Sequence, residues 1–199
     1  MLSKESYGYL RLCEAIDKVR REKESVIVAI DGNSAAGKTS LAALLKETYA
    51  CNVFSMDDFF LRPAQRTPER LSEPGGNIDY ERFSLEIIAP LTAAAPFSYR
   101  PYDCQSGGFK PAVQAARCGV NVFEGVYSLH PRFFDVYDLR VFLSLDETEQ
   151  RSRLASRNEA LYERFINEWI PMENRYFEHF DIPGRSGLVF DARDFAPDI

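Results

Sequence analysis

Short apolar runs alternate with longer stretches of helical character along the chain. The apolar runs, each of a length that suits a buried strand, are residues 25–31, 52–56, 119–123, 140–145 and 188–190. The stretches predicted to be helical are residues 3–23, the segment up to about Tyr49, and residues 81–93, 147–157 and 159–180, with Pro171 as a candidate break in the last. Strands that alternate with helices favour a parallel sheet covered on both faces. The predicted fold is therefore α/β, a three-layer α/β/α sandwich with a parallel sheet.

The first apolar run leads into the most specific motif of the chain. Residues 32–39 read Gly-Asn-Ser-Ala-Ala-Gly-Lys-Thr, the phosphate-binding P-loop pattern in its required place between a strand and a helix. Glycines let successive backbone N–H groups point at a polyphosphate, and the helix N-terminus adds partial positive charge. A chance glycine-rich turn is disfavoured because every fixed position matches. The residues expected to bind the nucleotide are Gly32, Asn33, Ser34, Ala35, Ala36, Gly37, Lys38, Thr39 and Ser40.

Two side chains of this motif carry its chemistry. Lys38 is expected to reach the β- and γ-phosphates, and the Thr39 hydroxyl is expected to ligate Mg²⁺. The fold is thus predicted to be of the P-loop NTPase or kinase type.

Carboxylates follow two of the other predicted strands. Asp57 and Asp58 come after the run 52–56, and Glu124 follows the run 119–123. Ligands of doubly wound sheets bind beyond the carboxyl ends of the strands. If the strand before Asp57 neighbours the first strand, the aspartates lie near the γ-phosphate, where Asp57 would act as a base or metal ligand. For Asp58 a solvated helix cap is the alternative.

The predicted helix 147–157 carries Arg151, Arg153 and Arg157. Such a run is usually a solvated helix face. Because this one follows a strand of a P-loop fold, we interpret Arg153 and Arg157 as lid residues that close on the transferred phosphate, and Arg151 as a solvated residue.

Two segments interrupt the alternation of strands and helices. Residues 61–80 contain three prolines and two glycines, and a loop of this length is usually functional or disordered. At its end, Asp79 is either a helix cap or a substrate contact. Residues 97–108 suggest a hairpin or edge insertion. We expect one domain over residues 1–199, with an N-terminal helix in 1–24, substrate-side insertions at 61–80 and 97–110, and a lid at 147–160.

Composition excludes several classes of function. The net charge of −6 argues against binding of nucleic acid through a general basic field. Four cysteines without a Cys-x-x-Cys pair and only two histidines give no zinc spacing and favour free thiols in a reducing cytoplasm. No apolar run approaches the ~20 residues of a membrane span, and the charged first residues do not form a signal peptide. We expect a cytoplasmic protein with neither a nucleic-acid nor a membrane partner; a homo-oligomer stays open.

Several motifs together resemble the uridine kinase family, within the phosphoribulokinase/uridine kinase group of P-loop kinases. They read DGNSAAGKTS, SMDDFF, NIDYERF, PYD, FEGVYSL and DETEQRSRLASRN, and they cover most of residues 25–180. The resemblance implies ATP-dependent transfer of the γ-phosphate, with Mg²⁺, to a primary hydroxyl of a small-molecule acceptor. This agrees with a site built for positioning and charge neutralisation.

The resemblance also implies roles for individual residues. Asp57 matches the general base of the family, and Glu124 matches the acidic residue near Mg²⁺. Asp79 and Tyr102 match the nucleoside contacts, and Arg153 and Arg157 match the lid, so that the catalytic set is Lys38, Asp57, Arg153 and Arg157. His130, in FEGVYSLHP, is either a further substrate contact or a loop or helix-cap histidine.

Two features differ from the pattern of the family. Gly107 stands where its pyrimidine kinases have a histidine, and no further lid arginine follows Arg157-Asn158. We therefore expect uridine and cytidine to be poor substrates. The alternatives are a kinase for another small alcohol, such as pantothenate, nicotinamide riboside or a sugar phosphate, and a nucleotide-binding regulatory NTPase. A GTPase is disfavoured because the Asn/Thr-Lys-x-Asp motif is absent.

Overall fold

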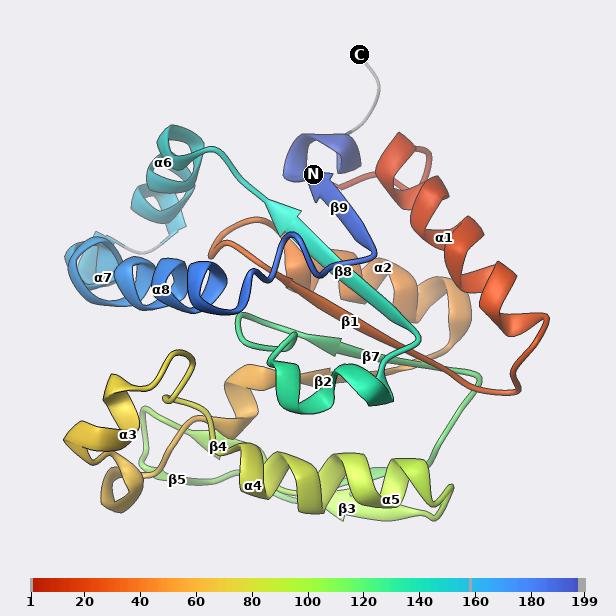
Figure 1. Ribbon diagram of the computed structural model, residues 1–199, viewed down its shortest axis with the longest axis horizontal. Coiled ribbons are helices and arrows are strands. Elements are labelled where there is room, and N and C mark those ends of the chain that lie inside the picture. The colour runs from red at the N-terminus through yellow and green to blue at the C-terminus, as the bar shows by residue number, and fades with distance from the viewer. Residues whose placement is uncertain (1, 158, 197–199) are drawn as a thin grey trace.

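A five-stranded parallel sheet forms the centre of the computed structural model, which describes residues 2–157 and 159–196 (Figure 1). The strand order is β2–β7–β1–β8–β9, and each neighbouring pair is parallel. The strands are β1 (Val26–Gly32), β2 (Asn52–Ser55), β7 (Val120–Glu124), β8 (Leu139–Ser144) and β9 (Leu188–Asp191). The predicted parallel sheet is confirmed, and all five strands overlap the apolar runs of the sequence.

Helices cover both faces of this sheet. On one face lie α1 (Tyr7–Arg20) and α2 (Lys38–Tyr49), which share an apolar core with Val26, Val28 and Ile30 of β1. The alternate residues Ile27 and Ala29 point into a second core on the other face. That core includes residues from α4 (Tyr80–Phe83), α5 (Ala89–Thr92) and α8 (Ile170–Phe180). The fold is therefore the predicted three-layer α/β/α sandwich, because a central parallel strand buries both of its faces.

Pro171 does not break its helix. The chain runs from α7 (Glu159–Arg164) through a π-helical turn, Phe165–Trp169, directly into α8. A proline ring displaces the carbonyl four residues earlier, and a widened turn just before it accommodates the change. The same arrangement recurs at Pro90, where the π-helical turn Ser84–Ile88 joins α4 to α5. The expectation of a break at Pro171 was therefore wrong, because the helix adapts locally.

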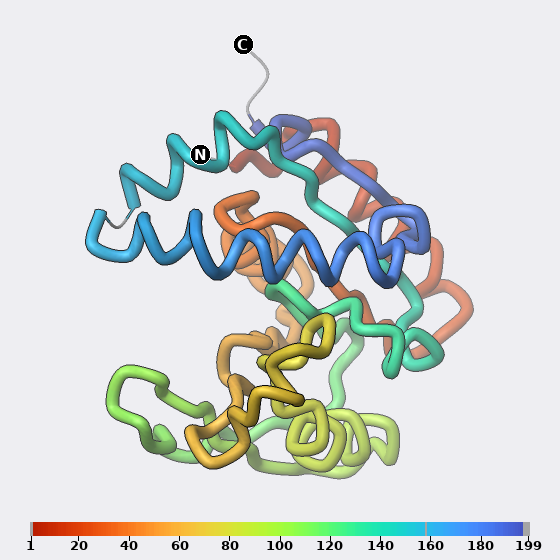
Figure 2. Tube along the Cα trace, turned by 60° about the vertical axis from the view of Figure 1, so that its left-hand side comes forward, coloured from red at the N-terminus to blue at the C-terminus, as the bar shows by residue number. Residues whose placement is uncertain are grey.

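The lid segment predicted at residues 147–160 begins with α6 (Glu147–Arg157). Five positions lie outside the described residues: 158 in this segment, 1 in the predicted N-terminal segment, and 197–199. In Figure 2 the helices α6 to α8 stand on one side of the P-loop, above the insertions. Within the described ranges, no helix is both long and apolar enough to cross a membrane.

The two insertions lie together below the edge of the central sheet that ends in β2, and Phe97 and Tyr99 of the second one pack against Phe54 of β2 (Figure 1). Residues 61–80 contain a 3-10 turn, Pro63–Gln65, and the short helix α3 (Pro68–Ser72). The other insertion forms two small antiparallel pairs, as the hairpin prediction expected. Their strands are β3 (Phe97–Tyr99) with β6 (Val113–Ala115), and β4 (Tyr102–Asp103) with β5 (Gly108–Phe109).

Candidate functional site

The P-loop turn joins the end of β1 to the start of α2 and depends on two glycines. Gly32 has a φ of +139°, and a Cβ there would lie 2.1 Å from the Leu143 carbonyl oxygen of β8. Gly37 has a φ of +98° and is the residue before the first turn of α2. Side chains rarely adopt these conformations, so both positions require glycine. The curled backbone leaves the N-terminus of α2 facing the concave side of the turn.

The side chains of Lys38 and Thr39 frame the expected phosphate site. Buried Lys38 turns back over the loop, and its Nζ donates to the carbonyl oxygens of Gly32 at 2.8 Å and Asn33 at 2.9 Å. The Thr39 hydroxyl donates to Glu124 Oε2 at 3.1 Å. Burial raises the pKa of the Glu124 carboxyl, and hydrogen bonds from Ser55 and Thr39 oppose this. A buried carboxylate beside a hydroxyl is thus placed at the mouth of the P-loop.

Asp31, the last residue before the P-loop, is a fully buried hub. Its carboxylate accepts hydrogen bonds from the backbone N–H groups of Gly32 (2.7 Å), Tyr127 (3.2 Å) and Leu129 (2.9 Å), and from the Tyr176 hydroxyl (2.9 Å). Burial raises the pKa of Asp31 to about 6, although the donors of Leu129, Gly32 and Tyr176 and the charge of Lys38 act in the opposite direction. Asp31 therefore ties β1, the segment after β7 and α8 into one support for the loop.

Two further side chains hold Ser34 within the loop. The buried Glu173 carboxylate of α8 accepts from the Ser34 N–H at 3.1 Å and from its hydroxyl. Gln150 of α6 donates to the Ser34 carbonyl oxygen at 3.1 Å. Every polar group of Ser34 is thus bonded to a helix that follows β8. Helix α6 of the predicted lid, helix α8 beyond it and the P-loop are therefore connected by hydrogen bonds.

Asp57 lies near the phosphate site by a different route from the one predicted. The strand before it, β2, does not neighbour β1, because β7 lies between them. Ser55 pairs with Glu124 in the β2–β7 register, and this places the turn Met56–Phe59 with Asp57 beside Glu124. The Asp57 side chain is exposed, yet the protein around it removes part of its hydration, and this raises its pKa. The charges of Lys38 and Arg157 lower the pKa of Asp57. Asp57 therefore lies at the same edge of the sheet as the P-loop, where the charge of Lys38 acts on its carboxylate.

Asp58 lies next to this carboxylate, half-buried. Its pKa is raised by burial and by the charges of Asp57 and Glu124, and it is lowered by Lys110 and Arg82. Its backbone carbonyl, rather than its side chain, accepts from Arg82. Three carboxylates thus share this edge of the sheet.

The arginines of α6 differ in their surroundings. Arg151 pairs with Glu147 at 2.7 Å on the helix surface, as the solvated alternative expects. Arg153 pairs with Glu149 and donates to the Ala35 carbonyl oxygen of the P-loop at 3.2 Å. Arg157 is exposed and lowers the pKa of Asp57 through its charge. Its role on a transferred phosphate, and that of Arg153, stay predictions.

Asp79 is a helix cap with both carboxylate oxygens in use. Oδ1 accepts from the Arg82 N–H of α4 at 3.0 Å, and Oδ2 accepts from Gln65 Nε2 at 2.8 Å. The side chain is buried, with Arg62 at 3.8 Å and the Arg82 Nε at 3.9 Å. The cap alternative is thus observed. A substrate contact by Asp79 stays a prediction, and it would have to share these bonds.

Tyr102 and His130, the other predicted substrate contacts, pack against aromatic rings. Tyr102 is buried, with its ring 5.6 Å from that of Phe109. The ring of His130 lies tilted against that of Tyr80 with a centroid distance of 4.3 Å, and its Nδ1 accepts from the Arg132 N–H at the start of the turn Pro131–Val136. Burial lowers the pKa of His130 to about 4. His130 therefore takes the helix-cap arrangement that the sequence left open, and its contact with substrate stays a prediction.

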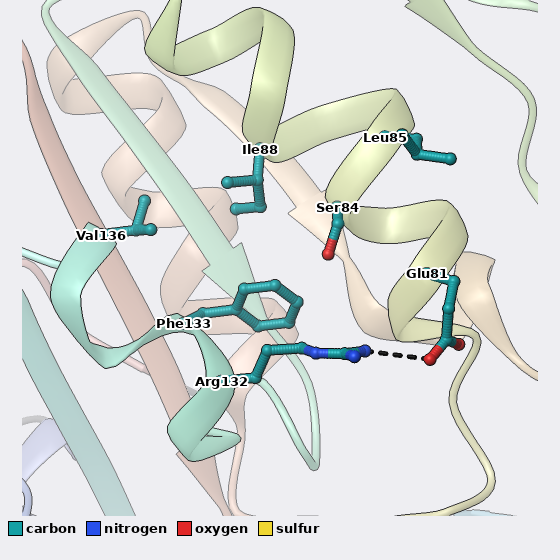
Figure 3. Close-up of a pocket in the computed structure, with 7 residues that line it drawn as sticks. All are labelled: Glu81, Ser84, Leu85, Ile88, Arg132, Phe133 and Val136. Atoms are coloured by element: carbon teal, nitrogen blue, oxygen red, sulfur yellow. Dashed lines mark hydrogen bonds and ion pairs between the residues drawn. The ribbon is translucent and has the colours of Figure 1, made fainter.

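A separate groove of about 510 Å³ lies between the α4–α5 helical segment and the turn Pro131–Val136 (Figure 3). An ion pair between Arg132 and Glu81 at 3.0 Å closes one end of it. Its lining is mainly apolar and includes no residue of the P-loop. The lining residues are Glu81, Ser84, Leu85, Ile88, Arg132, Phe133 and Val136. The phosphate chemistry of the loop does not extend to this groove.

Asp31, Gln150 and Glu173 are site residues that sequence reasoning missed. The sequence did contain a signal for Asp31, because a carboxylate that follows five apolar residues of a buried strand must find hydrogen-bond partners in the fold. Glu173 had a weaker one: it occupies the helical stripe of Ile170 and Tyr176, which are buried. Its partner in the P-loop lies 139 residues away in sequence, so no local pattern identifies it.

Comparison with known proteins agrees with this geometry. No family model matches the sequence. Uridine-cytidine kinase C of Dictyostelium discoideum is 28% identical over 142 residues, which are 69% of this chain; the chain covers only 31% of the length of that curated relative. A structure described as a possible uridine kinase from Bacillus stearothermophilus aligns with a TM-score of 0.65 and 22% identity, over 91% of this chain and 100% of that one. The chain has the fold of a P-loop kinase.

A second solved structure supports the same fold. D-glycerate 3-kinase from Cryptococcus neoformans aligns with a TM-score of 0.63 and 14% identity, over 92% of this chain and 93% of that one. The predicted resemblance to the uridine kinase group is confirmed at the level of similarity. These two similarities show a shared fold and no shared acceptor, because kinases that act on different acceptors can have the same fold.

Proposed function

We propose that this protein is an ATP-dependent kinase that transfers the γ-phosphoryl group to a hydroxyl of a small molecule. One observation carries the proposal: the P-loop residues Lys38 and Thr39 lie at the same sheet edge as Glu124 and the turn with the exposed Asp57 carboxylate. A nucleotide-binding regulatory protein needs the P-loop but has no need of a base beside it. Similarity to a uridine-cytidine kinase supports this reading.

The donor nucleotide binds at the P-loop. Its phosphates lie against the N-terminus of α2, where backbone N–H groups and the Lys38 ammonium neutralise their charge. Lys38 Nζ holds two loop carbonyls in the structure, so the loop orients the ammonium before the nucleotide arrives.

The oxygen donors near the loop suit Mg²⁺. The Thr39 hydroxyl and the Glu124 carboxylate lie 3.1 Å apart, and Mg²⁺ prefers such ligands together with phosphate oxygens. The buried Glu124 carboxylate gains a counter-charge in this way. When bound, the ion supplies charge neutralisation between the β- and γ-phosphates.

Asp57 acts as the general base in this proposal. The acceptor oxygen attacks the γ-phosphorus, the bond to the β–γ bridging oxygen breaks, ADP leaves, and the hydroxyl proton passes to the Asp57 carboxylate. Loss of hydration raises the pKa of Asp57 towards the range in which a carboxylate accepts protons effectively. Arg157 faces the same carboxylate and is placed to neutralise the phosphoryl group as it transfers.

The experiment that tests this function measures phosphorylated acceptor and ADP together. Purified protein with ATP and Mg²⁺ is offered nucleosides, vitamins, hydroxy acids and sugar phosphates, and product is detected by mass spectrometry. The proposal expects acceptor-dependent ADP release that Lys38→Ala abolishes, with weakened ATP binding. ATP turnover independent of every acceptor, or an unaffected Lys38→Ala variant, would contradict it.

A further inference from the structure

Arg66, in the insertion between Leu61 and α3, is a cation without an acidic partner. Its Nε donates to the Leu61 carbonyl oxygen at 2.9 Å, and one terminal nitrogen lies 3.8 Å from the Cys104 sulfur. Of the carboxylates in residues 2–157 and 159–196, none lies within ion-pair distance of this guanidinium. The backbone bond fixes its direction, and a thiol is a weak acceptor, so the end of the guanidinium keeps free donors.

Cys104 connects Arg66 to the proposed base. Burial raises the pKa of the Cys104 thiol, the Arg66 guanidinium lowers it, and the Asp57 carboxylate raises it again. The Arg66 guanidinium contacts this sulfur, which belongs to the turn between β4 and β5, and β4 packs against the turn Met56–Phe59 that carries Asp57. In Figure 2 the 61–66 segment and this turn lie on the same side of the molecule, below α6 to α8. Arg66 thus lies on the insertions, on the side of the sheet edge that carries Asp57.

Lys110 is a second cation of this kind. It follows β5, and its charge lowers the pKa of Asp58, the neighbour of Asp57. Like Arg66, it forms no ion pair with the carboxylates that the structure describes. Lys110 follows β5, which pairs with β4, and β4 packs against the turn that carries Asp57 and Asp58, so both unpaired cations lie on the insertions beside this turn.

The groups that a nucleoside acceptor would need are engaged or missing. Both oxygens of Asp79 already accept hydrogen bonds from the protein, and its side chain is buried. Gly107 leaves open space, since a Cβ there would meet no atom within 4 Å. A site that selects a polar ring needs matched donors and acceptors at its edge. In contrast, a fixed and unpaired guanidinium matches a planar carboxylate or a phosphate.

We propose that the acceptor is a hydroxyl compound with an anionic group, a carboxylate or a phosphate monoester, and that Arg66 binds this group while Asp57 receives the hydroxyl proton. This inference rests on the proposed kinase function and names the substrate class of the same site. Lys110 adds long-range attraction for the anion and offsets the repulsion from the three carboxylates at the strand ends.

Matched pairs of acceptors test the inference. Glycerate is compared with glycerol, and ribose 5-phosphate with ribose, by the yield of phosphorylated product from ATP. The anionic member of at least one pair is expected to have a kcat/KM ~10-fold or more above that of its neutral partner, since one charge-assisted contact is worth about that factor. The glycerate and ribose 5-phosphate arms separate a carboxylate site from a phosphate site.

Variants of Arg66 assign the effect to this residue. Arg66→Gln is expected to raise the KM for the anionic acceptor ~10- to 100-fold, with the KM for ATP and the melting temperature unchanged. Arg66→Lys should restore part of the affinity, because a point charge remains. Arg117→Gln, at an exposed arginine ahead of β7, is the matched control and should behave as the wild type.

Two results would overturn the inference, and they differ. Efficient transfer to neutral acceptors such as uridine, with no effect of Arg66→Gln, would reject the anionic class and leave the kinase function standing. No phosphorylated product from any acceptor, although ATP binds, would reject the kinase function and this inference with it.

Discussion

The Glu173 carboxylate accepts hydrogen bonds from both the backbone N–H and the hydroxyl of Ser34, and so fastens α8 to the P-loop. The neighbouring Ala35 has a φ of +65°, a conformation that costs free energy for a residue with a side chain. Gln150 and Arg153 bond the carbonyls of the same two residues. The conformation of the loop is therefore maintained by helices that follow β8, and not by its glycines alone.

Glu173→Ala should loosen this connection. Ser34 would lose the two hydrogen bonds that it donates to Glu173 in a partly buried place, and an unmade buried hydrogen bond costs ~1–3 kcal/mol. We expect a loss of about this size in the free energy of unfolding, measured by urea denaturation, and weaker binding of ATP. Glu173→Gln keeps a carbonyl acceptor for the Ser34 N–H and should lose less. The exposed Glu178→Ala on the same helix is the control; wild-type stability and ATP affinity in Glu173→Ala would refute the role.

Tyr176→Phe tests the buried hub at Asp31. The Tyr176 hydroxyl donates to Asp31 Oδ2 at 2.9 Å, and both side chains are wholly buried. Hydrogen bonds to charged groups contribute ~1.5–3 kcal/mol, so the free energy of unfolding should fall by about that amount. Tyr7→Phe, at an exposed tyrosine of α1, should change it by less than ~0.5 kcal/mol. An equal, small effect of both substitutions would show that the hub contributes nothing to stability.

The pH dependence of turnover should report the surroundings of Asp57. A general base acts when ionised, so the rate is present above its pKa and is lost as the pH falls through it. Because loss of hydration raises the pKa of Asp57, the acid limb of kcat/KM should lie above the ordinary carboxyl pKa of ~3.9.

Arg157→Ala should move this limb in a defined direction. The Arg157 charge lowers the pKa of Asp57, so its removal should shift the acid limb to higher pH as well as reduce the rate. Arg151→Ala, which removes a charge from the same helix at a residue paired with Glu147, should leave the limb in place. A shift of the limb to lower pH, or the same shift in both variants, would show that the charge of Arg157 does not act on Asp57.

Much of this arrangement could be predicted because its signals are local. The P-loop motif specifies its own turn, and apolar runs mark the strands whose ends carry Asp57 and Glu124. Strand order could not be predicted: β7 separates β2 from β1, and the pairing of parallel strands depends on contacts far apart in the sequence. The β2–β7 register still brings Asp57 beside Glu124, so the expected neighbourhood arises through a different strand.

Other features depend on packing that a sequence pattern does not show. His130 was a candidate substrate contact, but its surroundings are the rings of Tyr80, Tyr176 and Phe180. Pro171 continues a helix because the turn before it widens. In both cases the packing around the residue could not be read from the local sequence; the contact of His130 with substrate stays a prediction.

The most direct test of the central claim is phosphoryl transfer from γ-labelled ATP to the best acceptor by Asp57→Asn, with ATP affinity measured on the same sample. Asparagine preserves the shape of the side chain but cannot take the hydroxyl proton. The account predicts unchanged ATP binding and melting temperature with at least a ~10²-fold loss in the rate of transfer, the lower end of the contribution of a general base. A transfer rate near that of the wild type would contradict the assignment of Asp57 as the base.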